Sequence, residues 1–286
     1  MSTNPPIHSL ALKTIDNSKE LDQFYTNTII SKKCMSFLSS IYKLDDFFLL
    51  EPSAGTGSFS DQFHKNSIAY DIDPKKDYIE RADFLDLSVD ILPNKQIFTI
   101  GNPPFGKNSS LAIKFFNKSA MFSEYIAFIV PKTFNKISVT NKLDLNFSKV
   151  KEFELPLDSF VFQNSKYSVP CVFQVWKKMD VKRDKVKTRT KSELFEFSNK
   201  SSSDFAIRRV GRLAGKFIDN FQKYQESSHY FIKVKKNKVK LKREIKNLFS
   251  TFNNQARNCA SNPSLSKHEF INLVEASMLN GGFPHE

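Results

Sequence analysis

The chain has 286 residues, of which 40% are hydrophobic and 13% aromatic, enough for one large domain or for one domain with a smaller appendage. It has no apolar run near the roughly 20 residues of a membrane span, no signal-peptide pattern, and three cysteines without the spacing of a disulfide framework or a zinc site. We therefore expect an intracellular, cytoplasmic protein that uses neither a membrane nor a metal.

The formal net charge of +13 is concentrated in the last third of the sequence. Residues 1–178 contain 21 Lys and Arg against 19 Asp and Glu, whereas residues 179–286 contain 22 against 11. An excess in one region predicts contact with a polyanion such as nucleic acid. Lysines that are merely solvated on the surface would give the same count.

Helical and strand patterns alternate along the first part of the chain. Apolar residues at helical spacing predict a helix from Asp22 to about Ser40. Short apolar runs predict strands near residues 47–50, 67–70, 81–85, 96–100, 126–130, 150–155 and 169–176. A helix is expected after the Gly-rich turn that follows the first strand. The pattern is typical of βαβ units and an open parallel sheet.

The sequence divides into three parts by composition. Residues 179–203 are charged, Ser-rich and poor in large aliphatic side chains, which indicates a linker. We therefore assign residues 1–178 to one domain and residues 204–286 to a second, basic region.

Within the basic region, strands are predicted at 205–210 and 229–234, and a helix from Val239 to about Phe252. A last helix is expected after Ser264, because the sequence Ser-Leu-Ser-Lys-His-Glu offers capping groups. We expect a small α+β unit.

A Gly-containing turn, Glu51-Pro52-Ser53-Ala54-Gly55-Thr56-Gly57, follows the first predicted strand. Ligands bind at the carboxyl ends of strands in open α/β sheets, where glycine lets the backbone approach the ligand. The turn lacks both the glycine spacing of dinucleotide sites and the lysine of phosphate-binding loops. Because an acid closes the strand, Glu51 suits a ligand whose near end is a cation, such as an amino-acid ammonium group.

Acidic residues also follow the next two predicted strands. Asp71 ends the second strand, where a carboxylate can accept hydrogen bonds from two ribose hydroxyls. An aspartate that only caps the next helix is the alternative. Asp83 and Phe84 come at the third strand, where they could bind an adenine amino group and pack against its ring.

The tetrapeptide Asn102-Pro103-Pro104-Phe105 follows the fourth predicted strand. Consecutive prolines fix φ and commit the chain to a rigid extended turn. Such a turn can hold an amide side chain, a free carbonyl and an aromatic ring in fixed relation, as needed to grip a planar amine by its edge and its face. A Pro-rich exit from a strand is the alternative for these four residues alone.

In this order the motifs resemble those of the S-adenosylmethionine-dependent amino-methyltransferases, in particular the branch that methylates the N6 amine of adenine in DNA. The resemblance covers about residues 22–178 and includes Gln23-Phe24-Tyr25-Thr26, which resembles the N-terminal cofactor element of that branch. It implies a Rossmann-like class I methyltransferase sheet, mostly parallel with a terminal antiparallel hairpin. It also implies that the target base is flipped out of a duplex.

The resemblance assigns S-adenosylmethionine to Thr26, Glu51, Ser53, Gly55, Gly57, Asp71, Ile72, Asp83 and Phe84. Thr26 and Glu51 would hold the methionine end, and Asp71 would bind the ribose. Ile72 and Phe84 would sandwich the adenine, whose amino group would be bound by the acid before Phe84.

The same resemblance assigns the target base to the catalytic tetrapeptide Asn102, Pro103, Pro104 and Phe105. The Asn102 side chain and the Pro103 carbonyl would accept hydrogen bonds from the two N–H groups of the amine. These bonds would favour a pyramidal nitrogen with an available lone pair, and would stabilise the positive charge that develops on it. Phe105 would stack on the base. The residues expected to contact nucleic acid are Lys107, Phe162, Arg208, Arg209, Lys235, Lys236 and Lys238.

Four functions remain open at this point: methylation of DNA, of RNA or of a protein, and non-catalytic binding of nucleic acid. The N-terminal element favours DNA, whereas Phe105 followed by Gly106 also resembles certain RNA adenine-N6 methyltransferases. A related motif serves enzymes that methylate a glutamine amide in release factors, but a protein substrate would not need the basic region. A non-catalytic nucleic-acid-binding subunit would be expected to have broken motifs, which this sequence does not. The basic region is too small for the large target-recognition domains of many restriction-associated enzymes.

Overall fold

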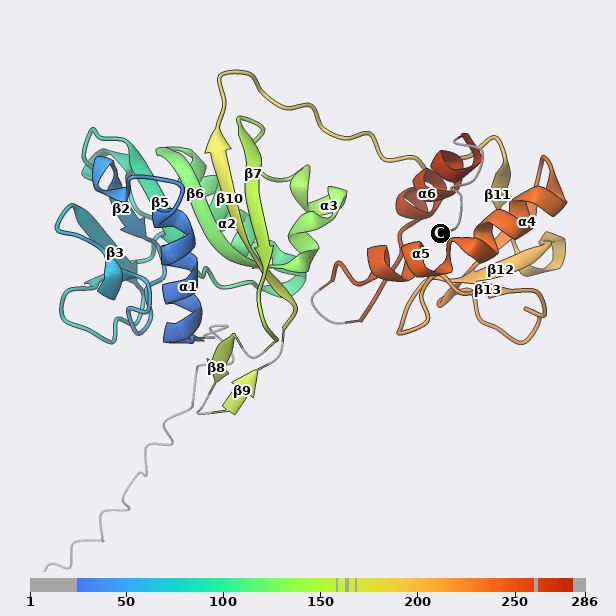
Figure 1. Cartoon of the computed structure of the whole chain (residues 1–286), viewed down its shortest axis with the longest axis horizontal. Helices are drawn as coiled ribbons and strands as arrows, with labels where there is room; N and C mark the ends of the chain where they lie inside the picture. Colours follow the sequence, from blue (N-terminus) through green and yellow to red (C-terminus); the bar gives the residue numbers. More distant parts are fainter. Residues whose placement is uncertain (1–24, 158, 163–164, 168, 260–261, 280–286) are drawn as a thin grey trace, which may run out of the picture.

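The computed structural model describes residues 25–157, 159–162, 165–167, 169–259 and 262–279. It shows two bodies side by side, joined by an extended segment that leaves β10 and crosses to the second body (Figure 1). The first body contains a 7-stranded sheet and the second a 4-stranded sheet. Among the described helices, none combines the length and the apolar character needed to cross a bilayer.

The strands of the large sheet lie in the order β4-β3-β2-β5-β6-β10-β7. Their bounds are β2 Phe48–Glu51, β3 Ser67–Asp71, β4 Glu80–Arg81, β5 Ile97–Gly101, β6 Ser123–Pro131, β7 Phe147–Glu154 and β10 Cys171–Lys178. Each neighbouring pair from β4 to β6 is parallel, whereas β10 is antiparallel to both β6 and β7. The predicted Rossmann-like class I sheet, mostly parallel with a terminal antiparallel hairpin, is therefore confirmed.

The strands bury side chains on both faces, so successive residues enter different cores. Leu49 packs with α1 (Thr28–Ser39), whereas Leu50 packs with α2 (Ser110–Ala120). Strand β6 alternates in the same way between the two clusters. The sheet is thus a middle layer between the two helices.

The connection from β2 to β3 differs from the prediction. The helix expected after the Gly-rich turn is wrong, because the segment contains a single 3-10 turn, η2 (Ser60–Gln62). The rest of the connection between Glu51 and Ser67 consists of turns, bends and irregular backbone. A second 3-10 turn, η3 (Val89–Ile91), precedes β5.

Helix α1 starts at Thr28, later than the predicted Asp22. Tyr25–Thr26 forms β1, which pairs with β8 (Phe160–Phe162), and β8 pairs with β9 (Ser165–Tyr167). The side chain of Asn27 accepts a hydrogen bond of 2.9 Å from the backbone N–H of Ile29 and so caps the helix. This cap, together with strand pairing, sets the helix boundary.

The second body is an α+β unit, as predicted. Its strands lie in the order β11-β14-β12-β13, with bounds β11 Phe195–Phe197, β12 Phe205–Arg208, β13 Phe217–Ile218 and β14 His229–Val234. Its helices are α4 Lys238–Asn247, α5 Phe249–Ala256 and α6 Lys267–Leu279. The single helix predicted from Val239 to Phe252 is corrected to two, because Leu248 has a ψ of 6° that interrupts the helix.

The range 179–203 is only partly a linker. Near its start, Arg183 donates hydrogen bonds to the carbonyls of Thr140 at 2.6 Å and Phe147 at 2.9 Å in the first body. Near its end, β11 pairs with β14, so that part of the range belongs to the second sheet. The extended segment is therefore attached to both bodies.

Candidate active site

Three predicted site residues meet at one edge of the large sheet. Glu51 ends β2, Asp71 ends β3, and Asn102 follows β5, and these three strands are neighbours in the sheet. Gly101 lies against Glu51, since a Cβ added there would be 3.4 Å from the Glu51 Cγ. The Ser53 hydroxyl donates a 3.2 Å hydrogen bond to the Asn102 carbonyl, so the Gly-rich turn and the tetrapeptide touch.

The Gly-rich turn requires its glycines. Gly55 has a φ of +52° and Gly57 a φ of +80°, in the left-handed region that glycine adopts at little cost. A Cβ on Gly57 would lie 2.3 Å from the Tyr78 hydroxyl, and one on Gly55 would lie 2.9 Å from the Tyr25 ring. Two tyrosine side chains therefore flank the turn at these positions.

Asp71 is buried and holds the turn in place. One carboxylate oxygen accepts a 2.7 Å hydrogen bond from the Gly55 N–H, and the other accepts a 2.8 Å bond from the Asp73 N–H. Each oxygen keeps a second lone pair. The helix-capping alternative is wrong, because residues 72–79 form no helix and Asp71 binds backbone N–H groups of two turns instead. The ribose contact stays a prediction.

Glu51 is almost inaccessible, at 2% exposure. One of its oxygens accepts a 2.8 Å hydrogen bond from the Ser60 N–H. Burial raises the pKa of Glu51 to about 8, the Ser60 contacts oppose this shift, and the charges of Asp71 and Asp61 add to it. A bound cation would lower this pKa and favour the carboxylate, so the environment suits an ammonium group.

The Asn-Pro-Pro-Phe turn lies between the two cores of the first body. Pro103 is buried, Asn102 and Pro104 are half-buried, and the Phe105 side chain packs against both clusters. The following residues are strained, because Asn108 and Ser109 have φ values of 55° and 63° although neither is glycine. The tetrapeptide is therefore held at the sheet edge from both faces.

The predicted adenine-binding residues differ in accessibility. Ile72 is 45% exposed and Asp83 is exposed, with one Asp83 oxygen accepting a 2.9 Å hydrogen bond from the Leu85 N–H. Phe84 is only 1% exposed, and its ring stacks on Phe115 with centroids 5.4 Å apart. Phe84 thus has the contacts of a core residue, whereas Ile72 offers an apolar surface to a ligand.

The N-terminal element reaches the same site. Thr26 is 8% exposed, and its carbonyl accepts a 2.8 Å hydrogen bond from the hydroxyl of Ser58, the residue that follows the Gly-rich turn. Thr26 also pairs with Phe160, so β8, the strand that contains Phe162, runs alongside. Residues 23–24 of the predicted element lie outside the described residues.

The two predicted arginines near the second sheet already make contacts within the protein. The Arg208 Nε donates a 3.0 Å hydrogen bond to the Val210 carbonyl, and the Arg209 guanidinium lies 5.6 Å from the centre of the Tyr230 ring. Both arginines are half-buried, whereas Lys107 is exposed in η4 (Lys107–Ser109) beside the tetrapeptide. The structure does not bring the arginines into the cluster around Asn102.

The three predicted lysines are all exposed, but they differ in their ion pairs. Lys235 lies 3.8 Å from the Glu196 carboxylate and Lys238 is ion-paired with Asp204, while no ion pair of Lys236 occurs in the described part of the chain. A phosphate would have to compete with a carboxylate at two of the three positions.

Some residues at the site carried no recognised motif. Tyr78 donates a 2.5 Å hydrogen bond to the Asp61 carboxylate, which also binds Lys76, and this group lies against Gly57. The position of Tyr25 inside the N-terminal element was a signal that could have identified it. No comparable pattern marks Tyr78, because its position depends on how the 73–79 loop folds back over the turn.

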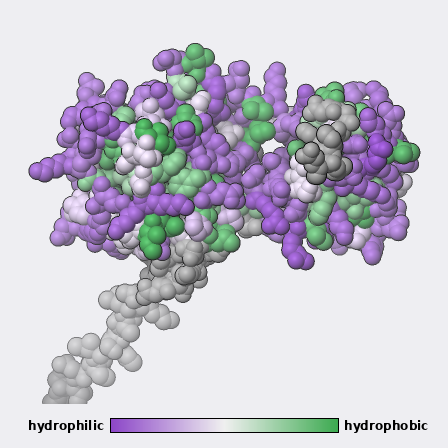
Figure 2. Space-filling model, viewed as in Figure 1, coloured by the Kyte–Doolittle hydropathy of each residue, from purple (hydrophilic) through white to green (hydrophobic). Residues whose placement is uncertain are grey.

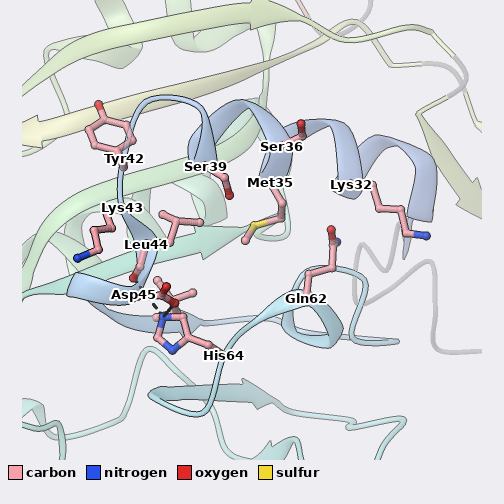
Figure 3. A pocket seen from close by; sticks show the side chains of 11 residues that line it. Lys32, Met35, Ser36, Ser39, Tyr42, Lys43, Leu44, Asp45, Gln62 and His64 are labelled. Carbon is pink, nitrogen blue, oxygen red and sulfur yellow. Dashed lines mark hydrogen bonds and ion pairs between the residues drawn. The ribbon is translucent and has the colours of Figure 1, made fainter.

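A hollow of about 690 Å³ lies elsewhere on the first body, beside α1 (Figure 3). Met35 and Leu44 line it together with polar side chains, and His64 and Asp45 face each other 3.9 Å apart within it. It contains none of the predicted site residues. In the described residues, no group of three or more His, Cys, Asp or Glu could hold a metal ion.

No model of a known protein family matches the chain, and no curated protein matches it in sequence. Among solved structures, a putative RNA methyltransferase from Pyrococcus horikoshii is similar at 16% identity over 56% of this chain and 88% of that chain, with a TM-score of 0.45. The 23S rRNA methyltransferase ErmE is similar at 16% identity over 56% and 70%, with a TM-score of 0.39. A type I restriction-modification methyltransferase subunit from Streptococcus thermophilus is similar at 12% identity over 92% and 59%, with a TM-score of 0.40.

Proposed function

We propose that this chain transfers a methyl group from S-adenosylmethionine to the exocyclic N6 amine of adenine in DNA. The observation that carries the proposal is the meeting of Glu51, Asp71 and Asn102 at the carboxyl ends of three adjacent parallel strands. A methyl donor held by the two acids and an amine held by Asn102 would lie next to each other, since β2 pairs directly with β5.

The donor side of this edge fits S-adenosylmethionine. The buried Glu51 carboxyl suits the ammonium of the methionine end, and Asp71 has lone pairs for the ribose hydroxyls. The exposed Ile72 side chain follows Asp71 directly and suits the apolar face of adenine. When bound, the sulfonium of this cofactor supplies an electrophilic methyl group.

The acceptor side explains how a weak nucleophile would react. The adenine amine is poorly nucleophilic because its lone pair is delocalised into the ring. Hydrogen bonds from its two N–H groups to the Asn102 side-chain oxygen and the Pro103 carbonyl would localise that lone pair on nitrogen. The nitrogen could then accept the methyl group that the bound sulfonium would supply, with the carbon–sulfur electrons left on sulfur and the amine proton released to water.

The remaining parts of the proposal concern the polymer. The second body carries most of the net positive charge, and the face in Figure 2 is largely hydrophilic over it. Phosphate contacts are sequence-blind, so they serve DNA and RNA alike. A base in a duplex would have to be flipped out to reach Asn102, and Phe105 would stack on it.

Methyl transfer measured on three substrates in parallel tests the proposal. The full chain is incubated with labelled S-adenosylmethionine and with duplex DNA, RNA or a protein extract, and the products are digested and separated as nucleosides or amino acids. We expect label in N6-methyldeoxyadenosine. Label in RNA alone would replace DNA by RNA, and label in protein alone, or in nothing, would overturn the proposal.

Asn102→Ala tests the acceptor assignment in the same assay. We expect transfer to fall at least about a hundredfold, because a preorganised hydrogen-bond partner of the reacting group is removed, while calorimetry shows nearly unchanged cofactor affinity. Asp71→Ala is the matched variant on the donor side and should weaken cofactor binding. Activity that survives in Asn102→Ala would show that the tetrapeptide is not the acceptor site.

A further inference from the structure

Lys136 makes an unusual contact between the two bodies. It lies between η5 (Lys132–Asn135) and α3 (Ile137–Thr140) of the first body, and its side chain is only 14% exposed. Its ammonium donates a 2.7 Å hydrogen bond to the Ser264 carbonyl and lies 3.8 Å from the Glu269 carboxylate, both in the second body. Figure 1 shows α3 on the side of the first body that faces the second.

The segment that receives Lys136 is firmly built into the second body. Ser264 forms a bridge with Val210, and its N–H donates a 2.9 Å hydrogen bond to the Ala256 carbonyl at the end of α5. Glu269 is held by the capping box of α6, in which it accepts a 2.7 Å hydrogen bond from the Ser266 N–H. Lys136 therefore meets a fixed surface and not a loose loop.

The other end of η5 contacts the loop formed by residues 102–109, which contains the tetrapeptide and which we call the acceptor loop. The Thr133 hydroxyl is 2.7 Å from the Ser109 hydroxyl, and Ser109 is 3% exposed. Ser109 follows Phe105 by four residues and holds the strained loop after the tetrapeptide. The short η5 thus joins the acceptor loop at one end to the second body at the other.

We propose that Lys136 is a positioning residue that docks the basic second body against the acceptor loop. Nucleic acid bound by the second body would then be presented to Asn102 at a fixed distance. A buried ammonium costs free energy unless it is hydrogen-bonded and paired, so this contact selects one placement of the two bodies. This inference rests on the proposed function, because presentation matters only if nucleic acid is the substrate.

Lys136→Met tests the inference through two measurements on the full chain. Two contacts on one polymer reinforce each other only when both can be made at once. We therefore expect the KM for nucleic acid to rise by about tenfold, while the KM for S-adenosylmethionine stays unchanged. Small-angle X-ray scattering should show a larger radius of gyration, since the docking contact is lost.

Two variants serve as controls. Lys136→Arg keeps a cation that can reach the Ser264 carbonyl, so its KM for nucleic acid should stay close to that of the wild type. Lys43→Met removes the same charge from an exposed pair with Asp46 within the first body and should change neither measurement. If the wild type methylates nucleic acid and Lys136→Met keeps its KM, the inference alone is wrong. If the wild type methylates no nucleic acid, the proposed function has failed, whatever the scattering shows.

Discussion

At the scale of single residues, the buried position of Glu51 is unfavourable for its negative charge when no ligand is bound. In the proposed function the carboxyl group meets the cofactor from a buried position, but burial disfavours its charged form. Its raised pKa, about 8, is the consequence. Neighbouring carboxylates increase the effect, so the site is balanced for a positively charged ligand.

This pKa predicts how stability depends on pH. The folded state binds the Glu51 proton more tightly than the unfolded state does, since the pKa is raised from 4.5 to about 8. The stabilisation is therefore complete below pH 4.5 and is lost as the pH rises through 8. Without cofactor, we expect the free energy of unfolding in urea to fall over this range by at least about 1.4 kcal/mol, the value of one pKa unit.

Glu51→Gln should remove this part of the pH dependence, because the amide keeps an oxygen for the Ser60 N–H but does not titrate. Glu80→Gln changes an exposed carboxylate on β4 and serves as the control, which should keep the wild-type profile. A profile that is the same in Glu51→Gln and in the wild type would show that Glu51 is not buried as a protonated group.

At the scale of elements, the second body depends on one close contact between a turn and a helix. Gly215 lies between β12 and β13 with a φ of +93°, and a Cβ there would come 2.3 Å from the Cβ of Phe252 in α5. Phe252 is fully buried in the core of the second body. The turn therefore packs directly on the helix.

Gly215→Ala should destabilise the second body by about 1–3 kcal/mol, the usual cost of overpacking, with a further penalty from the left-handed backbone. Unfolding in urea followed by circular dichroism measures this. Gly211→Ala is the matched control, because its φ is +87° but the nearest atom to an added Cβ is an Arg208 side-chain nitrogen at 3.5 Å. Equal losses in the two variants would mean that strain, and not the Phe252 contact, sets the cost.

At the scale of the whole molecule, fewer basic side chains of the second body are free to bind phosphates than its number of Lys and Arg residues indicates. Lys242 and Lys246 share the Asp219 carboxylate at 3.0 and 3.1 Å, and Arg189 pairs with Glu275 at 2.6 Å. Local ion pairs thus use part of the positive charge. The remaining excess still provides a long-range attraction for a polyanion.

Replacement of Lys235, Lys236 and Lys238 by Gln tests their contact with phosphates. Since two of these lysines face carboxylates, we expect the slope of log affinity against log salt to fall by only about 1, the effect of roughly one lost phosphate contact. Filter binding to duplex DNA at several salt concentrations measures the slope. Replacement of Lys43, Lys65 and Lys95 in the first body removes the same charge and should leave it unchanged. An unaltered slope in the first variant would make those lysines an ordinary solvated surface.

The sequence alone was sufficient to place most strands and the order of the site motifs. Hydrophobic runs such as the one ending at Glu51 mark strands buried on both faces, and strands of this kind meet at their carboxyl ends in any parallel sheet. Asp71 and Asn102 could therefore be expected beside Glu51. The capping box at Ser266 and Glu269 was also readable, because caps are local in sequence.

Other features were decided only by the tertiary structure, because they depend on contacts between segments far apart in the chain. Phe84 has the sequence context of a ligand contact, but its ring packs in the core against Phe115. Tyr78 reaches the Gly-rich turn because its loop folds back. Strand β11 lies within the predicted linker but pairs with β14 of the second body. Lys136 looks like any surface lysine until the second body meets it at Ser264, since no local pattern encodes a contact across 128 residues.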